Sequence, residues 1–362
     1  MKITLIAGAR PNLMKIAPII HAIHDAQNKK QNIEYRLVHT GQHYDKKMSG
    51  DFFDELNIPE PHANLSSGGG SQAEQTAAIM IRFEKELLEN PTDLVLVVGD
   101  VTSTMACSIV AQKLNTKVAH IEAGIRSNDW SMPEEINRLV TDAITNYFFT
   151  TTNDASKNLV KSGVNENTIY FVGNTMIDTL LANIDKLKEP SFYKEKGLKE
   201  KSYFVMTLHR PANVDQESQL KELLEEIIKN SKDYQLIFPV HPRTSKILEN
   251  LGLSNERLHF VEPLGYLEFN YLVKNSFAVI TDSGGITEET TVLGVPCMTL
   301  RDNTERPETV TLGTNELIGT DPKAIAPALN KLFDGNWKKG TIPDLWDGKT
   351  AERIIDILTN LN

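Results

Sequence analysis

The chain has very little cysteine and no long apolar run, and both absences narrow its class. Only two cysteines, Cys107 and Cys297, occur in 362 residues. They are far apart and lie in apolar patterns, so we expect buried apolar side chains and neither a disulfide framework nor a thiolate metal site. No apolar run approaches the ~20 residues that cross a bilayer, and the N-terminal segment lacks the features of a signal peptide. A soluble protein of the cytoplasm is predicted.

Positive charge is also scarce. Lysine and arginine number 38 against 48 acidic residues, which gives a formal net charge of −10. This balance disfavours nonspecific binding to nucleic acid or acidic membranes, although a local basic pocket for an anionic small substrate remains allowed. The histidines lack HxH or HExxH spacing, and the early GARPN segment is not the GxGxxG fingerprint of a dinucleotide fold. Neither a metal nor a cofactor is therefore predicted.

What the chain does have is a regular alternation of strand-like and helix-like segments. The length, 40% hydrophobic residues and 24% charged residues are typical of a soluble protein with two domains. The alternation predicts an α/β fold with two Rossmann-like parallel-sheet domains and an interdomain cleft. The expected strands are 2–7, 33–39, 94–98, 117–121, 147–150 and 168–172, then 203–208, 235–238, 258–261 and 277–280.

Domain boundaries are placed by changes in composition. The charged segment 186–202 fits a linker region. We predict a first domain over 1–172, a second over 173–349, and a C-terminal helix, 350–362, that packs back on the first domain. The Gly- and Ser-rich segment 61–72 is expected to be a surface loop and not a phosphate cradle, because no strong strand leads into it.

Polar groups collect just after the expected strands of both halves. In parallel sheets the ligand lies beyond the carboxyl ends of the strands. Each group alone has a plain explanation as a cap, a turn or a surface charge, but together they predict a polar ligand. The groups are Gly8 to Pro11, Gly99 and Asp100, Glu122 to Arg126, His209 and Arg210, His241 to Arg243, and Ser283 to Gly285.

The segment that begins at Ser283 reads as a phosphate site. It follows a short apolar strand, and Gly284 and Gly285 let a ligand approach the backbone at the start of a helix. Ser283 can cap that helix. Glu288 and Glu289 lie one turn further, where a carboxylate either supports the helix start or accepts hydrogen bonds from a sugar diol.

Two further sets carry charge suited to chemistry. Asp100, Glu122 and Glu134 could act as general acids and bases, while an ion pair with Arg126 or Arg138 is the competing interpretation for them. The cationic set suits a diphosphate, because arginine offers bidentate geometry and lysine a point charge. It comprises Arg10, Lys15, His209, Arg210 and Arg306.

Several motifs, taken in order, resemble those of the non-hydrolysing UDP-N-acetylglucosamine 2-epimerases, and the resemblance runs nearly end to end. The motifs are GARPNLMKIAP (8–18), TGQHYDKKM (40–48), GDVTST (99–104), HIEAGIRS (120–127), PEEINR (133–138), HRPAN (209–213), DSGGITEE (282–289) and LRDNTERPE (300–308). The resemblance implies a glycosyltransferase-B-like fold, a homodimer and a UDP-sugar substrate. It also implies inversion at C2, in which UDP is eliminated to give a 2-acetamidoglucal and then added back.

The resemblance also implies roles for single residues. Asp100, Glu122, Glu134 and His209 match positions of the sugar chemistry. Nucleotide binding is expected from a second set, in which Glu289 meets the ribose and Phe269 lies near the base. That set is Arg10, Lys15, Phe269, Ser283, Gly284, Gly285, Glu289 and Arg306. An effector site in bacterial relatives corresponds to Gln42, Arg210 and His241.

Some segments depart from the family pattern. HRPAN replaces the usual HRREN-like segment, and GARPN replaces the commoner GTRPE. These changes leave open the C3 and C6 substituents of the sugar, so a modified UDP-N-acetylhexosamine is a second possible substrate. Three further functions stay open, namely a glycosyltransferase with a UDP-sugar donor, a hydrolysing epimerase, and a sugar-nucleotide sensor without turnover.

Overall fold

The computed structural model describes residues 1–41, 52–214, 217–240, 248, 252–253 and 255–361. The chain divides into two compact units, each with its own sheet. Unit 1 comprises residues 1–182 and 344–362, and unit 2 comprises residues 183–343. No helix among the described residues has the length and apolar character needed to span a bilayer.

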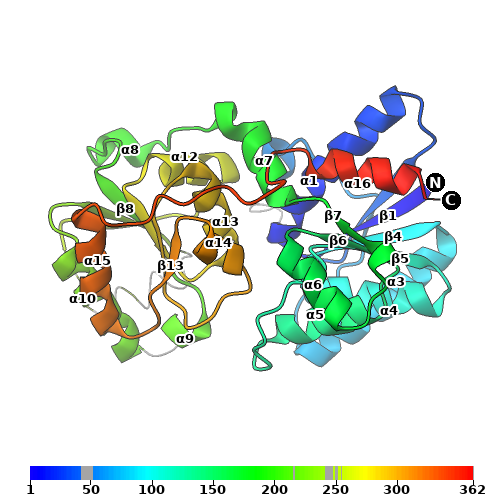
Figure 1. Ribbon diagram of the computed structural model, residues 1–362, viewed down its shortest axis with the longest axis horizontal. Coiled ribbons are helices and arrows are strands. Elements are labelled where there is room, and N and C mark those ends of the chain that lie inside the picture. Colours follow the sequence, from blue (N-terminus) through cyan, green and yellow to red (C-terminus); the bar gives the residue numbers. More distant parts are fainter. Residues whose placement is uncertain (42–51, 215–216, 241–247, 249–251, 254, 362) are drawn as a thin grey trace. The chain divides into compact units, whose positions relative to one another are not determined.

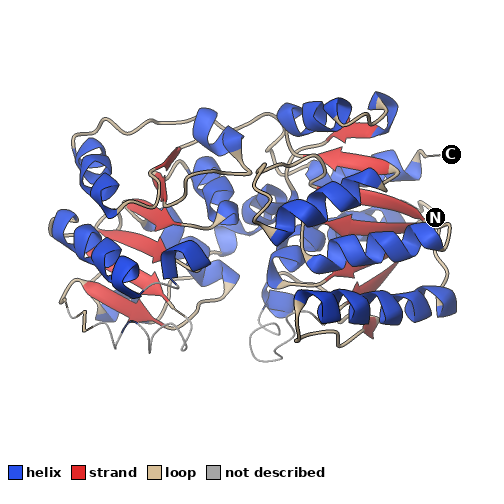
Figure 2. Cartoon of the chain, turned by 90° about the horizontal axis from the view of Figure 1, so that it is seen from below, coloured by secondary structure: helices blue, strands red, loops and turns tan. Residues whose placement is uncertain are grey.

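Unit 1 contains a seven-stranded parallel sheet with the order β3-β2-β1-β4-β5-β6-β7. Its central strands are buried along most of their length, because helices cover the sheet (Figure 2). The strands are β1 (Lys2–Ala7), β2 (Glu34–His39), β3 (Ala63–Asn64), β4 (Leu94–Val98), β5 (Lys117–Ile121), β6 (Tyr147–Thr150) and β7 (Ile169–Phe171). The helices are α1 (Arg10–Asn28), α3 (Gln72–Glu89), α4 (Thr102–Lys113), α5 (Pro133–Ala143), α6 (Asn153–Lys161), α7 (Thr175–Asn183) and α16 (Thr350–Thr359).

Unit 2 contains a six-stranded parallel sheet with the order β10-β9-β8-β11-β12-β13. The strands are β8 (Tyr203–Thr207), β9 (Gln235–Pro239), β10 (Leu258–Val261), β11 (Ala278–Thr281), β12 (Cys297–Thr299) and β13 (Asn315–Leu317). The helices are α8 (Phe192–Glu195), α9 (Pro211–Val214), α10 (Glu217–Asn230), α12 (Tyr266–Asn275), α13 (Gly284–Leu293), α14 (Pro307–Thr311) and α15 (Ile325–Phe333).

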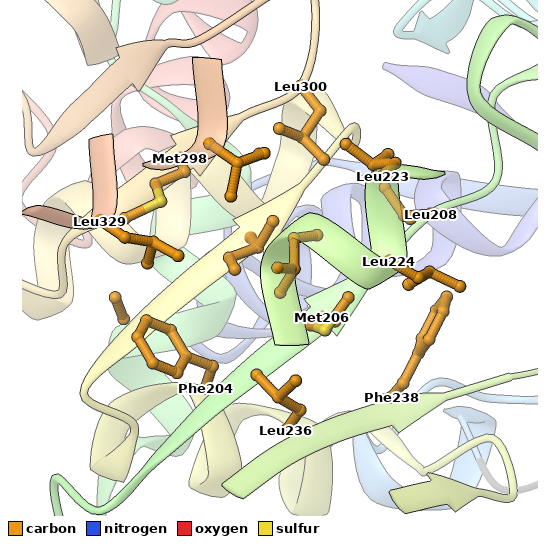
Figure 3. Packing of buried hydrophobic residues seen from close by; sticks show 14 of the residues in the cluster. Phe204, Met206, Leu208, Leu223, Leu224, Leu236, Phe238, Met298, Leu300 and Leu329 are labelled. Atoms are coloured by element: carbon orange, nitrogen blue, oxygen red, sulfur yellow. The ribbon is translucent and has the colours of Figure 1, made fainter. Parts of the chain in front are cut away.

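One face of the unit 2 sheet packs on α10 and α15. Figure 3 shows Phe204 and Met206 of β8 together with Leu223 and Leu224 of α10 and Leu329 of α15. These side chains alternate along the strands and recur at helical spacing along the helices, as expected for a sheet buried by amphipathic helices. The predicted parallel α/β architecture is confirmed for each unit.

The division into units differs from the boundaries predicted at 172/173 and 349/350. Helix α7 belongs to unit 1, because Asp178 accepts the N–H groups of Thr350 and Ala351 at 3.1 and 2.7 Å. The chain also returns to unit 1 before residue 350, since the buried Trp346 donates its Nε1–H to the Thr151 carbonyl at 3.0 Å. Helix α16 then lies beside α1 (Figure 1).

Three short strands were not predicted from the sequence. β3 lies inside the segment expected to be a surface loop, and β12 and β13 have three residues each. Strands of this length are too short for a hydrophobic alternation to stand out. The sequence pattern also predicts a helix from about residue 243, and this segment lies outside the described residues apart from Leu248.

Candidate active site

The candidate residues gather where the strand order of each sheet reverses. This reversal falls between β1 and β4 in unit 1 and between β8 and β11 in unit 2. In open parallel sheets, ligands bind outside the carboxyl ends of the strands at such a point. Each unit therefore has one place where a nucleotide sugar, or part of one, would be expected.

In unit 1, Asn12 connects the ends of β1 and β4. Its Oδ1 accepts the N–H groups of Gly8 and Ala9 at 3.1 and 3.0 Å, and its Nδ2 donates to the Val98 carbonyl at 3.1 Å. This fixes the loop that leads into α1. Arg10 begins α1, but its side chain lies outside the described part of the structure.

Lys15 and Glu122 form a buried ion pair at the same edge of the sheet. Lys15 Nζ lies 2.7 Å from Glu122 Oε2. Gly99 packs against this pair, because a Cβ at Gly99 would lie 3.2 Å from Lys15 Nζ. Glu122 has φ of 69°, a left-handed conformation that costs a non-glycine residue about 1–2 kcal/mol. Such strain concentrates at functional sites, and the ammonium group stabilises the ionised carboxylate that a general base requires.

Asp100 is held by an arginine from α5. Its Oδ2 accepts from Arg138 Nη2 at 2.6 Å and from Arg138 Nε at 3.0 Å, while Arg138 Nη1 donates to Glu135 at 2.6 Å. The ion pair with Arg138, which the sequence left open for this carboxylate, is therefore present. The Asp100 side chain remains 25% exposed. Glu134 is half-buried in the first turn of α5, and among the described residues no ion pair to it is found.

In unit 2, the buried carboxylate of Asp282 organises the turn after β8. It accepts the backbone N–H groups of His209 and Arg210 at 3.0 and 2.9 Å and the Asn213 amide at 3.0 Å. His209 Nδ1 lies 2.8 Å from Asp282 Oδ1, and the imidazole is 62% exposed. Burial alone would raise the pKa of Asp282, but the hydrogen bond and charge of His209 and the other donors bring it below its ordinary value. The carboxylate thereby orients the imidazole.

The start of α13 has the features of an anion site. Ser283 precedes the helix, but its hydroxyl does not cap it, contrary to the expectation from sequence. Gly284 is closely packed, because a Cβ there would lie 2.5 Å from Glu305 Oε1. Glu305 also accepts from Arg301 Nη2 at 2.6 Å, which brings a buried guanidinium close to the helix start. The helix dipole and this cation both favour an anionic group.

Glu289 of α13 is buried beside polar side chains of α12. Burial raises its pKa to about 7, although hydrogen bonds from Tyr266 and Asn270 act in the opposite direction. Asn270 Nδ2 lies 3.3 Å from Glu289 Oε1. Phe269, expected near the base, is half-buried on α12, between Tyr266 and Asn270 in the sequence. The structure therefore brings Phe269 and Glu289 to adjacent helices.

The remaining predicted residues have mixed placements. Arg306 is buried, and its Nε lies 2.6 Å from Glu288 Oε1, so Glu288 has an ion-pair partner. Arg210 Nε donates to the Asp282 carbonyl at 3.0 Å, beside the turn to Ser283. Gln42 and His241, expected at an effector site, lie outside the described residues.

Two residues of this arrangement were not singled out from the sequence. Asp282 stands directly before Ser283, and a charged residue at the end of a buried strand was the signal that could have identified it. Arg301 had no such signal, because its approach to Gly284 depends on how the loop after β12 folds back. Across the described part of the chain, no cluster of His, Cys, Asp and Glu could hold a metal ion.

The chain is similar to known proteins over nearly its whole length. The sequence profile of the UDP-N-acetylglucosamine 2-epimerase family matches residues 25–359. The chain belongs to this family. A UDP-N-acetylglucosamine 2-epimerase from Methanocaldococcus jannaschii is 44% identical, with 99% of each chain covered. The crystal structure of the M. jannaschii UDP-GlcNAc 2-epimerase in complex with UDP-GlcNAc and UDP matches with a TM-score of 0.89 at 43% identity, again over 99% of each chain.

The family includes other UDP-sugar specificities. A UDP-2,3-diacetamido-2,3-dideoxy-D-glucuronate 2-epimerase from Pseudomonas aeruginosa is 39% identical, and the match covers 100% of both chains. A lipopolysaccharide galactosyltransferase matches with a TM-score of 0.52 at 16% identity, over 99% of this chain and 97% of that one, which concerns the fold alone. The family member described here thus has the glycosyltransferase-B-like fold predicted from its sequence.

Proposed function

We propose that this epimerase interconverts UDP-GlcNAc and UDP-ManNAc by eliminating UDP and adding it back on the other face of C2. The observation that carries the proposal is the group of carboxylates at the strand ends of unit 1, where Glu122 is strained and paired with Lys15 at 2.7 Å. A C2 proton is weakly acidic, and its removal becomes feasible as the C1–O bond breaks. A base there and a firm hold on the departing UDP are both required.

The two units divide these tasks. In unit 1, Asp100, Glu122 and Glu134 move the C2 proton. In unit 2, His209 meets the charge that develops on the departing phosphate, and its orientation by Asp282 supports this role. The nucleotide is held by a second set that comes mostly from unit 2, in which the start of α13 takes the diphosphate and Glu289 the ribose. That set is Arg10 and Lys15 of unit 1 together with Phe269, Ser283, Gly284, Gly285, Glu289 and Arg306 of unit 2.

The test is an incubation with UDP-GlcNAc in deuterated water without any acceptor. We expect UDP-ManNAc to appear with deuterium at C2, as followed by proton NMR. Absence of both exchange and epimer would contradict the proposal. A glycosyltransferase would need an acceptor for turnover, and a hydrolysing epimerase would release free ManNAc with stoichiometric UDP, so the same spectra separate these reactions.

A second candidate substrate is a modified UDP-N-acetylhexosamine. The relative from P. aeruginosa, named for a UDP-2,3-diacetamido-2,3-dideoxy-D-glucuronate, supports it by its similarity over the whole chain. The measurement is kcat/KM for UDP-GlcNAc against its 3-acetamido and C6-oxidised forms. A preference of tenfold or more, about 1.4 kcal/mol, for a modified sugar would favour this candidate.

We also propose that the enzyme acts in the cytoplasm as a homodimer, as its family resemblance implies. Sedimentation velocity should then give twice the 40.5 kDa mass of one chain. A single species at the monomer mass across micromolar concentrations would contradict the dimer.

A further inference from the structure

A buried hydrogen-bonded pair connects β5 of the unit 1 sheet to helix α5, near the strand ends that precede Asp100 and Glu122. His120, in β5, is completely buried. Its Nε2 lies 2.8 Å from the Gly99 carbonyl oxygen, and its Nδ1 lies 2.8 Å from Asp142 Oδ1. A carbonyl can only accept, so Nε2 carries a proton.

The other ring nitrogen also donates. The second oxygen of Asp142 accepts from the Gly124 N–H at 3.1 Å and from Arg126 Nη1 at 2.6 Å. Burial alone would raise the pKa of Asp142, but His120 and Arg126 lower it below the ordinary value. Because the Gly124 N–H and the Arg126 guanidinium both donate to its second oxygen, Asp142 accepts from Nδ1 with its first oxygen, and both ring nitrogens of His120 are engaged.

This pair contacts both turns that position the candidate acid and base groups. His120 binds the carbonyl of Gly99, directly before Asp100. Asp142 binds the N–H of Gly124, two residues after Glu122. Both Gly99 and Glu122 have φ of 69°. Glycine adopts this conformation without strain, but for Glu122 it is unfavourable, so the turn at Glu122 needs support from its surroundings. The Gly99 N–H also donates to the Ile121 carbonyl at 3.0 Å, which closes the connection between the two strand ends.

Asp142 also forms a buried ion pair with Arg126, and a buried ion pair is seldom present for stability. The cost of removing two charges from water often exceeds their attraction, and a well-packed apolar pair of similar volume is frequently as stable. A hydrogen-bonded pair that contacts both of these turns has another physical use, because directional hydrogen bonds fix backbone positions more closely than apolar contacts do.

We propose that His120 and Asp142 are positioning residues for the epimerisation, which set the placement of Asp100 relative to Glu122. The inference rests on the roles proposed above for those two carboxylates. His120 is too deeply buried to touch the substrate. Its effect is expected on the rate of C2 proton transfer and not on UDP-sugar binding.

Two substitutions test the two hydrogen bonds of His120 one at a time. The amide nitrogen of asparagine lies near the position of Nδ1, and that of glutamine near the position of Nε2. His120→Gln thus retains the bond to Gly99, whereas His120→Asn retains only the bond to Asp142. We expect His120→Asn to lower kcat for C2 deuterium exchange about 100-fold, His120→Gln by about 10-fold or less, and KM to change by less than about threefold in both.

The control is Val118→Ala, a buried position on the same strand. Its kcat is expected to remain near that of the wild type at a comparable loss of thermal stability. If His120→Asn does not fold, Arg126→Gln tests the pair indirectly, because it removes a hydrogen-bond donor to Asp142. It should lower kcat about 3- to 10-fold with KM unchanged.

Amide hydrogen exchange gives a measurement that does not depend on activity. The Gly99 amide should exchange faster in His120→Asn and remain protected in His120→Gln. If both variants match Val118→Ala in kcat and in Gly99 protection, the inference is overturned. If wild-type enzyme does not epimerise UDP-GlcNAc while the Gly99 amide responds as expected, the proposed function fails and the positioning of this turn stands.

Discussion

At the scale of single residues, Glu122 gives the most direct prediction. Glu122→Gln removes the charge of the candidate base without changing its shape, so kcat for C2 exchange should fall by about 10²- to 10⁴-fold while UDP affinity changes little. Steady-state kinetics and UDP titration calorimetry measure the two effects. The matched control is Glu86→Gln in the same unit. It removes a different ion pair, in which Glu86 Oε1 lies 2.6 Å from Arg36 Nε. Equal losses of activity in both variants would contradict a catalytic role for Glu122.

The buried carboxyl of Glu289 predicts a dependence of stability on pH. Its pKa in the folded protein is raised to about 7 by burial, above the ordinary carboxyl value. The folded state thus binds the proton more tightly than the unfolded state. The stabilisation is complete below about pH 4.5 and is lost as pH rises to about 7, by about 3 kcal/mol. Urea unfolding across this range should show the decline in wild type and a flatter profile in Glu289→Gln.

The same titration predicts a pH dependence of ligand binding. Ribose hydroxyls donate to a carboxylate, so the affinity for a UDP-sugar should increase as pH rises through about 7. A UDP-sugar is preferable to UDP here, because its diphosphate diester does not titrate near neutrality. Calorimetry on wild type and Glu289→Gln isolates the contribution of this group. A pH profile that is identical in the two proteins would exclude Glu289 from the ribose contact.

At the scale of elements, the sequence predicted the long segments and missed the short ones. The helical periodicity of residues 266–275 predicts helix α12 with the bounds that the structure has, and the strand expected over 94–98 is β4. These segments have clear apolar periodicity. β12 and β13 have none, because three residues are too few to show it.

The same contrast applies to the candidate site. Positions within two residues of a strand end, such as Asp100 and Ser283, could be identified from the sequence, because the carboxyl ends of parallel strands share one edge. Their partners could be identified only in part. Arg138 was one of two partners left open for the carboxylates, and it pairs with Asp100, whereas the contact of Gly284 with the loop that carries Glu305 depends on tertiary packing. Sequence also provided no indication that Glu122 adopts a left-handed conformation.

Helix α16 provides a prediction about element stability. Asp178 of α7 accepts the N–H groups of Thr350 and Ala351 and so acts as a cap supplied from another helix. Asp178→Ala leaves these buried donors without an acceptor and should lower the free energy of unfolding of unit 1 by about 1–3 kcal/mol. Asp356→Ala, an exposed change on α16 itself, should have little effect. A loss of equal size in both variants, measured by thermal unfolding, would argue against the cap.

At the scale of the whole molecule, the two units share the same sheet topology. Both sheets follow the same strand order about their reversal point, and each unit has its own hydrophobic core. The chemistry is not repeated. Carboxylates collect at the strand ends of unit 1, whereas unit 2 has an oriented imidazole, a helix start and the buried Glu289. This asymmetry agrees with the elimination proposed above, in which the carboxylates of unit 1 remove a proton and unit 2 holds most of the leaving group.

The division of tasks predicts how UDP affects unfolding. With separate cores, the units should unfold in two calorimetric transitions, and the one lowered by Asp178→Ala belongs to unit 1. UDP at 100 times its Kd stabilises the unit that binds it by about 2.7 kcal/mol, which raises the transition of unit 2 by roughly 5–10 °C. Glu289→Gln should reduce this shift and Glu122→Gln should leave it intact. If UDP instead raises the transition that Asp178→Ala lowers, the nucleotide is held mainly by unit 1 and the assignment of tasks is wrong.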